Sequence, residues 1–310
     1  MAHFSATDAA LEGFRLARRN PKAVVVWALL ALVFNFAIIS VMIAIAGPAL
    51  TELNELNRAG PAAANSARTL ELAGPVMAGY LAMIPLAFIY LAVFSGAIFR
   101  GLVQPQDRAP GFLKLGGDEL RLLATSIVVC VISMVAIFLI SLILTILVGV
   151  IATAASGGGE PNLAVMIPGI LLLYVAIIFA ALAIYVKFSF AGPMTFVRKK
   201  ILIFQSWGAT NGRFWPLFGC YLLAIVLGVI VTLLGAVIGL AAMMALGGSI
   251  TALTSPNMSS LAAYFTPGMI AYLIVNSIVS GLTFAIYQAP AMTAYQAIHG
   301  AGGDVSGTFD

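Results

Sequence analysis

The sequence predicts an all-α polytopic membrane protein with six transmembrane helices, and three observations support this prediction. Of 310 residues, 62% are hydrophobic and only 8% are charged, and the mean hydropathy is +1.09. A soluble domain averages about 45–50% apolar and about 25% charged residues, so these charges are too few to cover a water-exposed surface. Six apolar stretches are long enough to cross a bilayer, and none shows the alternation of a β-barrel strand. The composition excludes soluble, disordered and collagen-like classes.

The six stretches lie near residues 22–46, 74–99, 121–153, 163–187, 213–247 and 267–298. Each is longer than the roughly 20 helical residues that cross the hydrocarbon core. Lipid offers backbone groups no hydrogen-bond partners, so continuous Leu, Ile, Val and Ala runs favour helices. The first stretch follows a basic segment, as in a signal peptide, but its apolar run is about twice the usual signal-peptide core. We therefore expect it to remain as a membrane anchor.

The distribution of Lys and Arg predicts the orientation. Thirteen of the fifteen lie in the N-terminal segment and in the second and fourth connections, and only Arg58 and Arg68 lie elsewhere. Positively charged connections stay in the cytoplasm, so we expect a multi-pass protein of the bacterial cytoplasmic (inner) membrane with both termini inside. The thirteen are Arg15, Arg18, Arg19, Lys22, Arg100, Arg108, Lys114, Arg121, Lys187, Arg198, Lys199, Lys200 and Arg213.

The connections on the other side differ in composition. The first, near residues 47–73, contains Thr51-Glu52-Leu53-Asn54-Glu55-Leu56, which can form a short helix outside the membrane. The connections at 154–162 and 248–266 are short or rich in Ser, Thr and Gly, as is typical of turns and loops.

The three cytoplasmic approaches to the membrane resemble one another. Each has a Phe six positions before a residue of a good N-cap type, namely Asn20, Asp118 or Thr210. A side-chain oxygen at such a position satisfies a free amide of the following helix. The pattern predicts one integral membrane domain, residues 1–310, with interfacial-helix-plus-hairpin repeat units at 5–101, 102–193 and 194–298 and a polar tail at 299–310. Alternatively, amphipathic basic connections common to polytopic proteins produce the same likeness.

No ionisable residue lies in the middle of a predicted span. Ion or proton coupling usually uses such residues, and hydrolysis within the membrane needs a nucleophile, a base or metal ligands at depth. The two cysteines fall inside apolar runs and the two histidines lie near the termini, so no metal-ligand spacing exists. We expect no enzymatic activity, no metal and no cofactor.

Polar residues at depth have two interpretations. Asn35, Asn276 and Gln288 either hydrogen-bond between helices or line a polar path between hairpins. Gly235 and Gly239 form a Gly-x-x-x-Gly pattern, which favours close helix packing within the chain over dimerisation.

Basic residues near the membrane boundary are candidates for contact with lipid headgroups. The run Arg198-Lys199-Lys200 lies close to Trp207 and Trp215. This arrangement fits either topology signals with an aromatic belt or a headgroup-binding surface. Nucleic-acid binding is not supported, because the cations are spread along the boundary. The headgroup candidates are Arg15, Arg18, Arg19, Arg198, Lys199, Lys200 and Arg213.

The segment Ser206–Trp215 resembles the "SW-x-L-T-x-G-x-FW" stretch of a diffuse group of bacterial six-helix inner-membrane proteins. That group includes membrane domains fused to glycerophosphodiester phosphodiesterases. Ala209 stands where the pattern has Leu, and the soluble phosphodiesterase domain is missing from this sequence. The resemblance therefore implies a six-span layout and carries no activity.

The function predicted from the sequence is a non-enzymatic membrane protein that binds or organises lipid or a partner membrane protein. The alternative is a small-solute transporter or facilitator subunit with a path lined by Asn35, Asn276 and Gln288. Membrane lipids are the expected partners, and the sequence does not predict an oligomeric state.

Overall fold

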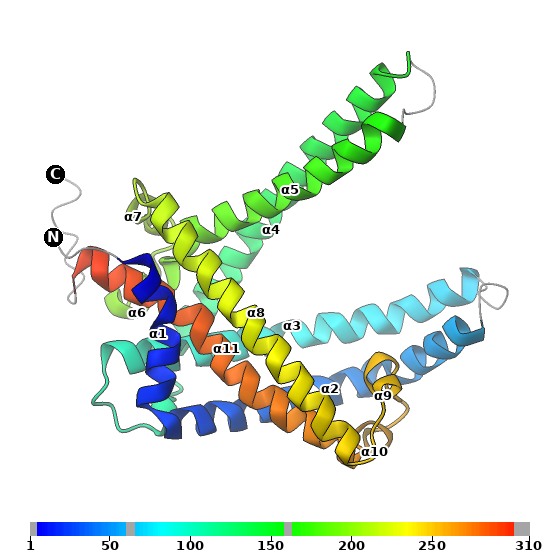
Figure 1. Ribbon diagram of the computed structural model, residues 1–310, viewed down its shortest axis with the longest axis horizontal. Helices are drawn as coiled ribbons and strands as arrows, with labels where there is room; N and C mark the ends of the chain where they lie inside the picture. The colour runs from blue at the N-terminus through cyan, green and yellow to red at the C-terminus, as the bar shows by residue number, and fades with distance from the viewer. Residues whose placement is uncertain (1–4, 60–65, 158–162, 301–310) are drawn as a thin grey trace. The chain divides into compact units, whose positions relative to one another are not determined.

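A computed structural model describes residues 5–59, 66–157 and 163–300, and in these ranges the chain forms helices and no strand. Among the described residues, six helices are long and apolar enough to cross a membrane (Figure 1). They are α2 (Pro21–Ala59), α3 (Ser66–Val103), α4 (Gly117–Ala154), α5 (Leu163–Phe188), α8 (Phe214–Ala245) and α11 (Pro267–His299). The predicted all-α class and the six spans are confirmed, and the chain is a multi-pass membrane protein. Most of the predicted polar tail, residues 301–310, lies outside the described residues.

Shorter helices lie between the spans and before the first. They are α1 (Ala6–Arg19), the 3-10 turn η1 (Pro110–Phe112), α6 (Ala191–Arg198), α7 (Gln205–Ala209), α9 (Ile250–Thr254) and α10 (Leu261–Tyr264). Helix α1 is amphipathic: Ala10, Gly13, Leu16 and Ala17 are buried at helical spacing.

Helix α2 continues beyond its apolar stretch to Ala59, so the predicted separate helix at residues 51–56 is wrong. That segment is instead the last part of α2. Arg68, at the start of α3, donates to both carboxylate oxygens of Glu52 at 2.6 and 2.7 Å. This two-point contact joins the ends of the α2–α3 hairpin.

The described residues form two compact units that interleave along the chain. One contains residues up to Ala9, Gly116–Leu222 and the chain from Ala291 onward; the other contains Ala10–Leu115 and Leu223–Pro290. We call them the first and second unit and describe each separately.

The core of the second unit surrounds Trp27, which is fully buried. Its indole N–H donates to the carbonyl of Gly111 at 2.8 Å, so the polar edge of the ring is satisfied inside an apolar core. The other members of this core are Leu16, Ala23, Ala31, Phe94, Ile98, Phe112, Ala285 and Ala289.

Glycines let helices of the second unit approach closely. A Cβ on Gly235 of α8 would lie 2.3 Å from Val279 of α11, and one on Gly239 would lie 3.0 Å from Tyr272. Both glycines therefore face α11, which confirms packing within the chain. A Cβ on Gly13 of α1 would lie 2.6 Å from the backbone of Ala285, so α1 also rests directly on α11.

In the first unit, the start of α4 packs against α6. The hydroxyls of Thr125 and Thr195 lie 3.2 Å apart in a buried contact between these helices. Phe190, which precedes α6, packs edge-on against Tyr295 near the end of α11 at 5.7 Å. These contacts place the connection between α5 and α8 against the ends of α4 and α11.

The predicted N-cap roles of Asn20 and Thr210 are wrong in the same way. The side-chain amide of Asn20 donates to the carbonyl of Leu16, at the end of α1. The hydroxyl of Thr210 donates to the carbonyls of Ser206 and Trp207 in α7, each at 3.1 Å. Both side chains therefore close the helix before them and do not cap the span after them.

Asp118 is also misassigned as a cap. Gly116 holds the N-cap position of α4, and its amide donates to the carboxylate of Glu119 at 3.0 Å. Asp118 lies inside the first turn, where the positive end of the helix dipole stabilises its negative charge. Its carboxylate also accepts hydrogen bonds from two cations.

Candidate functional site

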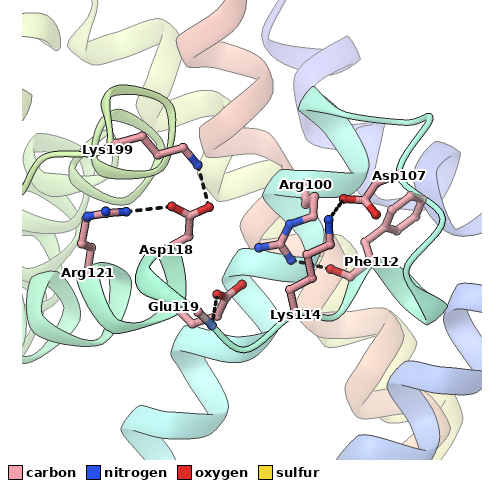
Figure 2. A network of polar contacts seen from close by, with 9 residues as sticks. Arg100, Asp107, Phe112, Lys114, Asp118, Glu119, Arg121 and Lys199 are labelled. Carbon is pink, nitrogen blue, oxygen red and sulfur yellow. Dashed lines mark hydrogen bonds and ion pairs between the residues drawn. The ribbon is translucent and has the colours of Figure 1, made fainter.

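The three residues of the Arg198-Lys199-Lys200 run have different environments in the first unit. Lys199 ends α6 in a left-handed backbone conformation, with φ of 56°. Its ammonium lies 2.6 Å from a carboxylate oxygen of Asp118 and 4.6 Å from the ring centre of Phe196. Arg121 reaches the other oxygen of Asp118 at 2.8 Å, as Figure 2 shows. Lys199 therefore has a structural role between α6 and α4.

Lys200 differs from its neighbours. It is exposed and has no ion-pair partner among the described residues, whereas Arg198 is half-buried. Arg213, just before α8, is likewise exposed and has no ion-pair partner in the described part of the chain. Lys200 and Arg213 are the two cations of this region that remain available to an outside ligand.

Ser206 holds the segment between these two cations in place. Its hydroxyl is fully buried, donates to the carbonyl of Lys187 at 2.7 Å and accepts from the amide of Phe190 at 3.1 Å. It thus satisfies backbone groups at the break between α5 and α6, where the helical ladder is interrupted. In the sequence Ser206 stands out only as part of a motif, and the helix break that it bridges has no signal there.

Contacts of Lys187 with Trp207 and Asn211 also hold the segment that follows α6. The ammonium of Lys187 lies 5.4 Å from the ring centre of Trp207 and donates to Asn211 at 2.8 Å. The ring of Phe188 also packs edge-on against Trp207, with the ring centres 5.8 Å apart. A cation over an aromatic face is a favourable contact, so the Trp207 ring has a defined position.

Large exposed apolar side chains lie close in the sequence to the two available cations. Phe204 is 71% exposed, Trp215 68% and Trp207 48%, and Ile201 is also exposed. We call Lys200, Ile201, Phe204, Trp207, Arg213 and Trp215 the aromatic–basic surface. Aromatic and basic side chains together suit the boundary between lipid headgroups and hydrocarbon, where Trp is enriched.

The cations of α1, in the second unit, are partly neutralised. Arg15 and Arg19 both pair with Glu12, at 3.4 and 3.2 Å. Arg18 is exposed and forms no ion pair within the described ranges. Of the three predicted headgroup candidates here, Arg18 is the most available.

Arg100 is a residue whose place the sequence did not indicate. In the sequence, Arg100 counts among the cations of a cytoplasmic connection. In the structure it is buried, with only 3% exposed, and its side chain donates to the carbonyl of Phe112 at 2.6 Å (Figure 2). Gly111, with φ of 60°, makes the turn that aims this loop. Buried Arg100 and Trp27 thus hold the 110–112 turn from two sides.

Asp107 and Lys114 pair at the base of the same loop (Figure 2). The hydrogen bond from Lys114, with a second from the amide of Ala109, lowers the pKa of the Asp107 carboxyl. The carboxylate is therefore charged and occupied at neutral pH.

The predicted polar intramembrane residues do not gather in one place. Asn35 donates to the hydroxyl of Ser277 at 3.3 Å, a contact between α2 and α11 in the second unit. Gln288 lies twelve residues after Asn276 on α11, about 18 Å along the helix axis. A cavity of about 590 Å³ near Asn35 is lined only by apolar residues such as Phe36, Phe265 and Leu273.

Within the described ranges, no group of three or more His, Cys, Asp or Glu side chains is placed to hold a metal ion. Comparison with known proteins gives no match: no family model, no curated protein and no solved structure matches this chain. The class that the fold defines is a multi-pass helical membrane protein, and the aromatic–basic surface is its candidate functional site.

Proposed function

We propose that this chain is a non-enzymatic integral membrane protein that binds anionic lipid headgroups at the aromatic–basic surface. The proposal rests on one observation. Lys200 and Arg213 are exposed and have no ion-pair partners in the described residues, and the same segment of chain exposes Trp207 and Trp215. The tryptophans suit the level of the headgroups, and the cations attract negative charge there.

The magnitude of the attraction is set by the two cations. Each basic residue near an anionic leaflet contributes about 1 kcal/mol. Two such residues give about 2 kcal/mol, or a preference of about 30-fold for an anionic over a neutral headgroup. Ser206 and Lys187 already hold the segment, so binding orders few additional groups.

We place the protein in the bacterial inner membrane with both termini in the cytoplasm. The support is the excess of Lys and Arg in the N-terminal segment and the second and fourth connections. In this orientation the aromatic–basic surface contacts the cytoplasmic leaflet, whose anionic lipids carry the negative surface potential.

We also propose that the chain consists of three related sequence repeats, at residues 5–101, 102–193 and 194–298. Support comes from Asn20 and Thr210, whose side chains both bond to the carbonyl four residues earlier and so end a short helix before a span. The resemblance of Ser206–Trp215 to the membrane domains linked to glycerophosphodiester phosphodiesterases belongs with this proposal. In this proposal the hydrogen bonds of Ser206 and Thr210 to backbone carbonyls fix the conformation of residues 206–215. Trp207 and Trp215 then contact the bilayer boundary.

The test of lipid binding is extraction into lipid nanodiscs followed by mass spectrometry of the retained lipid. We expect enrichment of anionic lipid with the wild-type chain and a clear reduction of that enrichment in Lys200→Glu/Arg213→Glu. Arg58→Glu is the control, because it reverses an exposed cation in a different connection. Equal enrichment in all three proteins would contradict the proposal, and bulk lipid with a stoichiometric protein would indicate a partner-binding role instead.

A further inference from the structure

The second unit contains a hollow of about 420 Å³ that is separate from the aromatic–basic surface. One wall is the break between α1 and α2, and the other is the loop of residues 107–112. Three cations line it: Arg19 and Lys22 from the first wall and Arg108 from the second. Its volume is in the range of small-ligand sites.

Three hydrogen-bond acceptors around the hollow already have donors, and Asp107, the one carboxylate among the lining residues, is one of them. The Gly111 carbonyl accepts from Trp27, and the Phe112 carbonyl accepts from Arg100. The Asp107 carboxylate accepts from Lys114 and from the amide of Ala109. The loop therefore offers little negative charge to the cations that line the hollow.

The cations, in contrast, have unused capacity. Lys22 and Arg108 are exposed and have no ion-pair partner in the part of the chain that the structure describes. Arg19 shares the single carboxylate of Glu12 with Arg15. The lining contains three cations and one carboxylate, Asp107, which already pairs with Lys114, so a bound anion would compensate the excess positive charge.

We propose that this hollow binds the phosphate of an anionic phospholipid headgroup. Arg108 contacts the phosphate oxygens, for which a guanidinium offers two parallel donors, and Lys22 supplies a second charge. The first wall adjoins the start of α2 and the second follows the end of α3, and the ends of spans are where we expect headgroups. The choice of a lipid source rests on the proposed function, whereas the phosphate site itself rests on the hollow.

The experiment titrates detergent-solubilised full-length protein with short-chain phosphatidylglycerol, using phosphatidylcholine of the same chain length as the neutral comparison. The background is Lys200→Glu/Arg213→Glu, so that only the hollow is measured. A parallel titration uses inorganic phosphate. Because each headgroup cation contributes about 1 kcal/mol, we expect Arg108→Gln to weaken phosphatidylglycerol binding about 5-fold and Lys22→Gln/Arg108→Gln about 25-fold.

Arg58→Gln is the control, because Arg58 is an exposed cation of the same unit that does not line the hollow and is not a headgroup candidate. Losses in Arg108→Gln with less than a 2-fold change in Arg58→Gln support the proposal. Inorganic phosphate binding with the same dependence on Arg108, without phosphatidylglycerol binding, supports the phosphate site but assigns a soluble source. Equal losses in both variants, or no loss in either, overturn the site. These outcomes do not depend on the nanodisc comparison, because the wild type and Lys200→Glu/Arg213→Glu both keep the hollow and differ only in the aromatic–basic surface.

Discussion

At the scale of single residues, buried hydroxyls position the aromatic–basic surface and exposed charges give it its chemistry. Ser206 and Thr210 are fully buried and bond to backbone groups, while Lys200 and Arg213 are exposed. Lys199, although adjacent to Lys200, bonds to Asp118 and is not available to a ligand in the same way. Charge alone is therefore a poor guide to which cation binds.

Replacing Ser206 with Ala should lower stability. The carbonyl of Lys187 and the amide of Phe190 would lose their partner in a buried place, at a cost of about 1–3 kcal/mol. Thermal unfolding in detergent measures the change. Ser141→Ala is the control, because that hydroxyl bonds within its own helical turn; an equal loss in both variants would argue against the bridging role.

The Asp107–Lys114 pair should make stability depend on acid pH. The folded-state pKa of Asp107 lies below its ordinary value, chiefly because Lys114 bonds to it. The stabilisation is present above the ordinary aspartate pKa and is lost as pH falls through the folded-state pKa. We expect the difference in melting temperature between the wild type and Asp107→Asn to shrink on acidification, and a constant difference across pH would rule this out.

Residue-scale predictions from the sequence failed where the end of a short helix, or a carbonyl further along the chain, decides the role. Asn20 and Thr210 are good N-cap types, yet both bond backwards, because the short helices α1 and α7 end at those positions. Arg100 looked like a loop cation, and its burial depends on a carbonyl twelve residues later. Neither local composition nor spacing contains that information.

At the scale of elements, hydropathy predicted the spans well because lipid forces each apolar stretch to satisfy its own backbone. Helix α5 was expected at 163–187 and runs Leu163–Phe188, and α11 was expected at 267–298 and runs Pro267–His299. The exceptions are α2, which extends to Ala59 through a polar segment, and α3, which was expected from residue 74 and begins at Ser66. Hydropathy cannot detect a helix that continues into water.

Close packing of α8 on α11 should be sensitive to a single methyl group. In Gly235→Ala the new Cβ would meet Val279 at 2.3 Å, so the helices must separate, at a cost of about 1–3 kcal/mol. Gly219→Ala makes the same change on α8 where no atom lies within 4 Å, and it should be neutral or stabilising. Thermal unfolding compares the two, and equal effects would contradict the packing face.

At the scale of the whole molecule, the proposed orientation rests on where the cations lie. Thirteen of fifteen Lys and Arg residues belong to the N-terminal segment and to alternate connections. The helical layout gives an even number of spans among the described residues, so the two ends of the chain are expected on the same side.

A reporter whose activity depends on its compartment tests this orientation. Fused after Asp310, it should give the cytoplasmic signal, because the cation bias holds that end inside. Inserted between α4 and α5, it should give the opposite signal. The same signal from both positions would show that the orientation is wrong.

The burial of Arg100 has a consequence for biogenesis. Its guanidinium lies at the end of α3, but the Phe112 carbonyl that it contacts is made twelve residues later. At a synthesis rate of about 5–20 residues per second, that interval is on the order of a second. During this interval the guanidinium cannot make its final hydrogen bond, so the end of α3 settles only after the following loop has emerged.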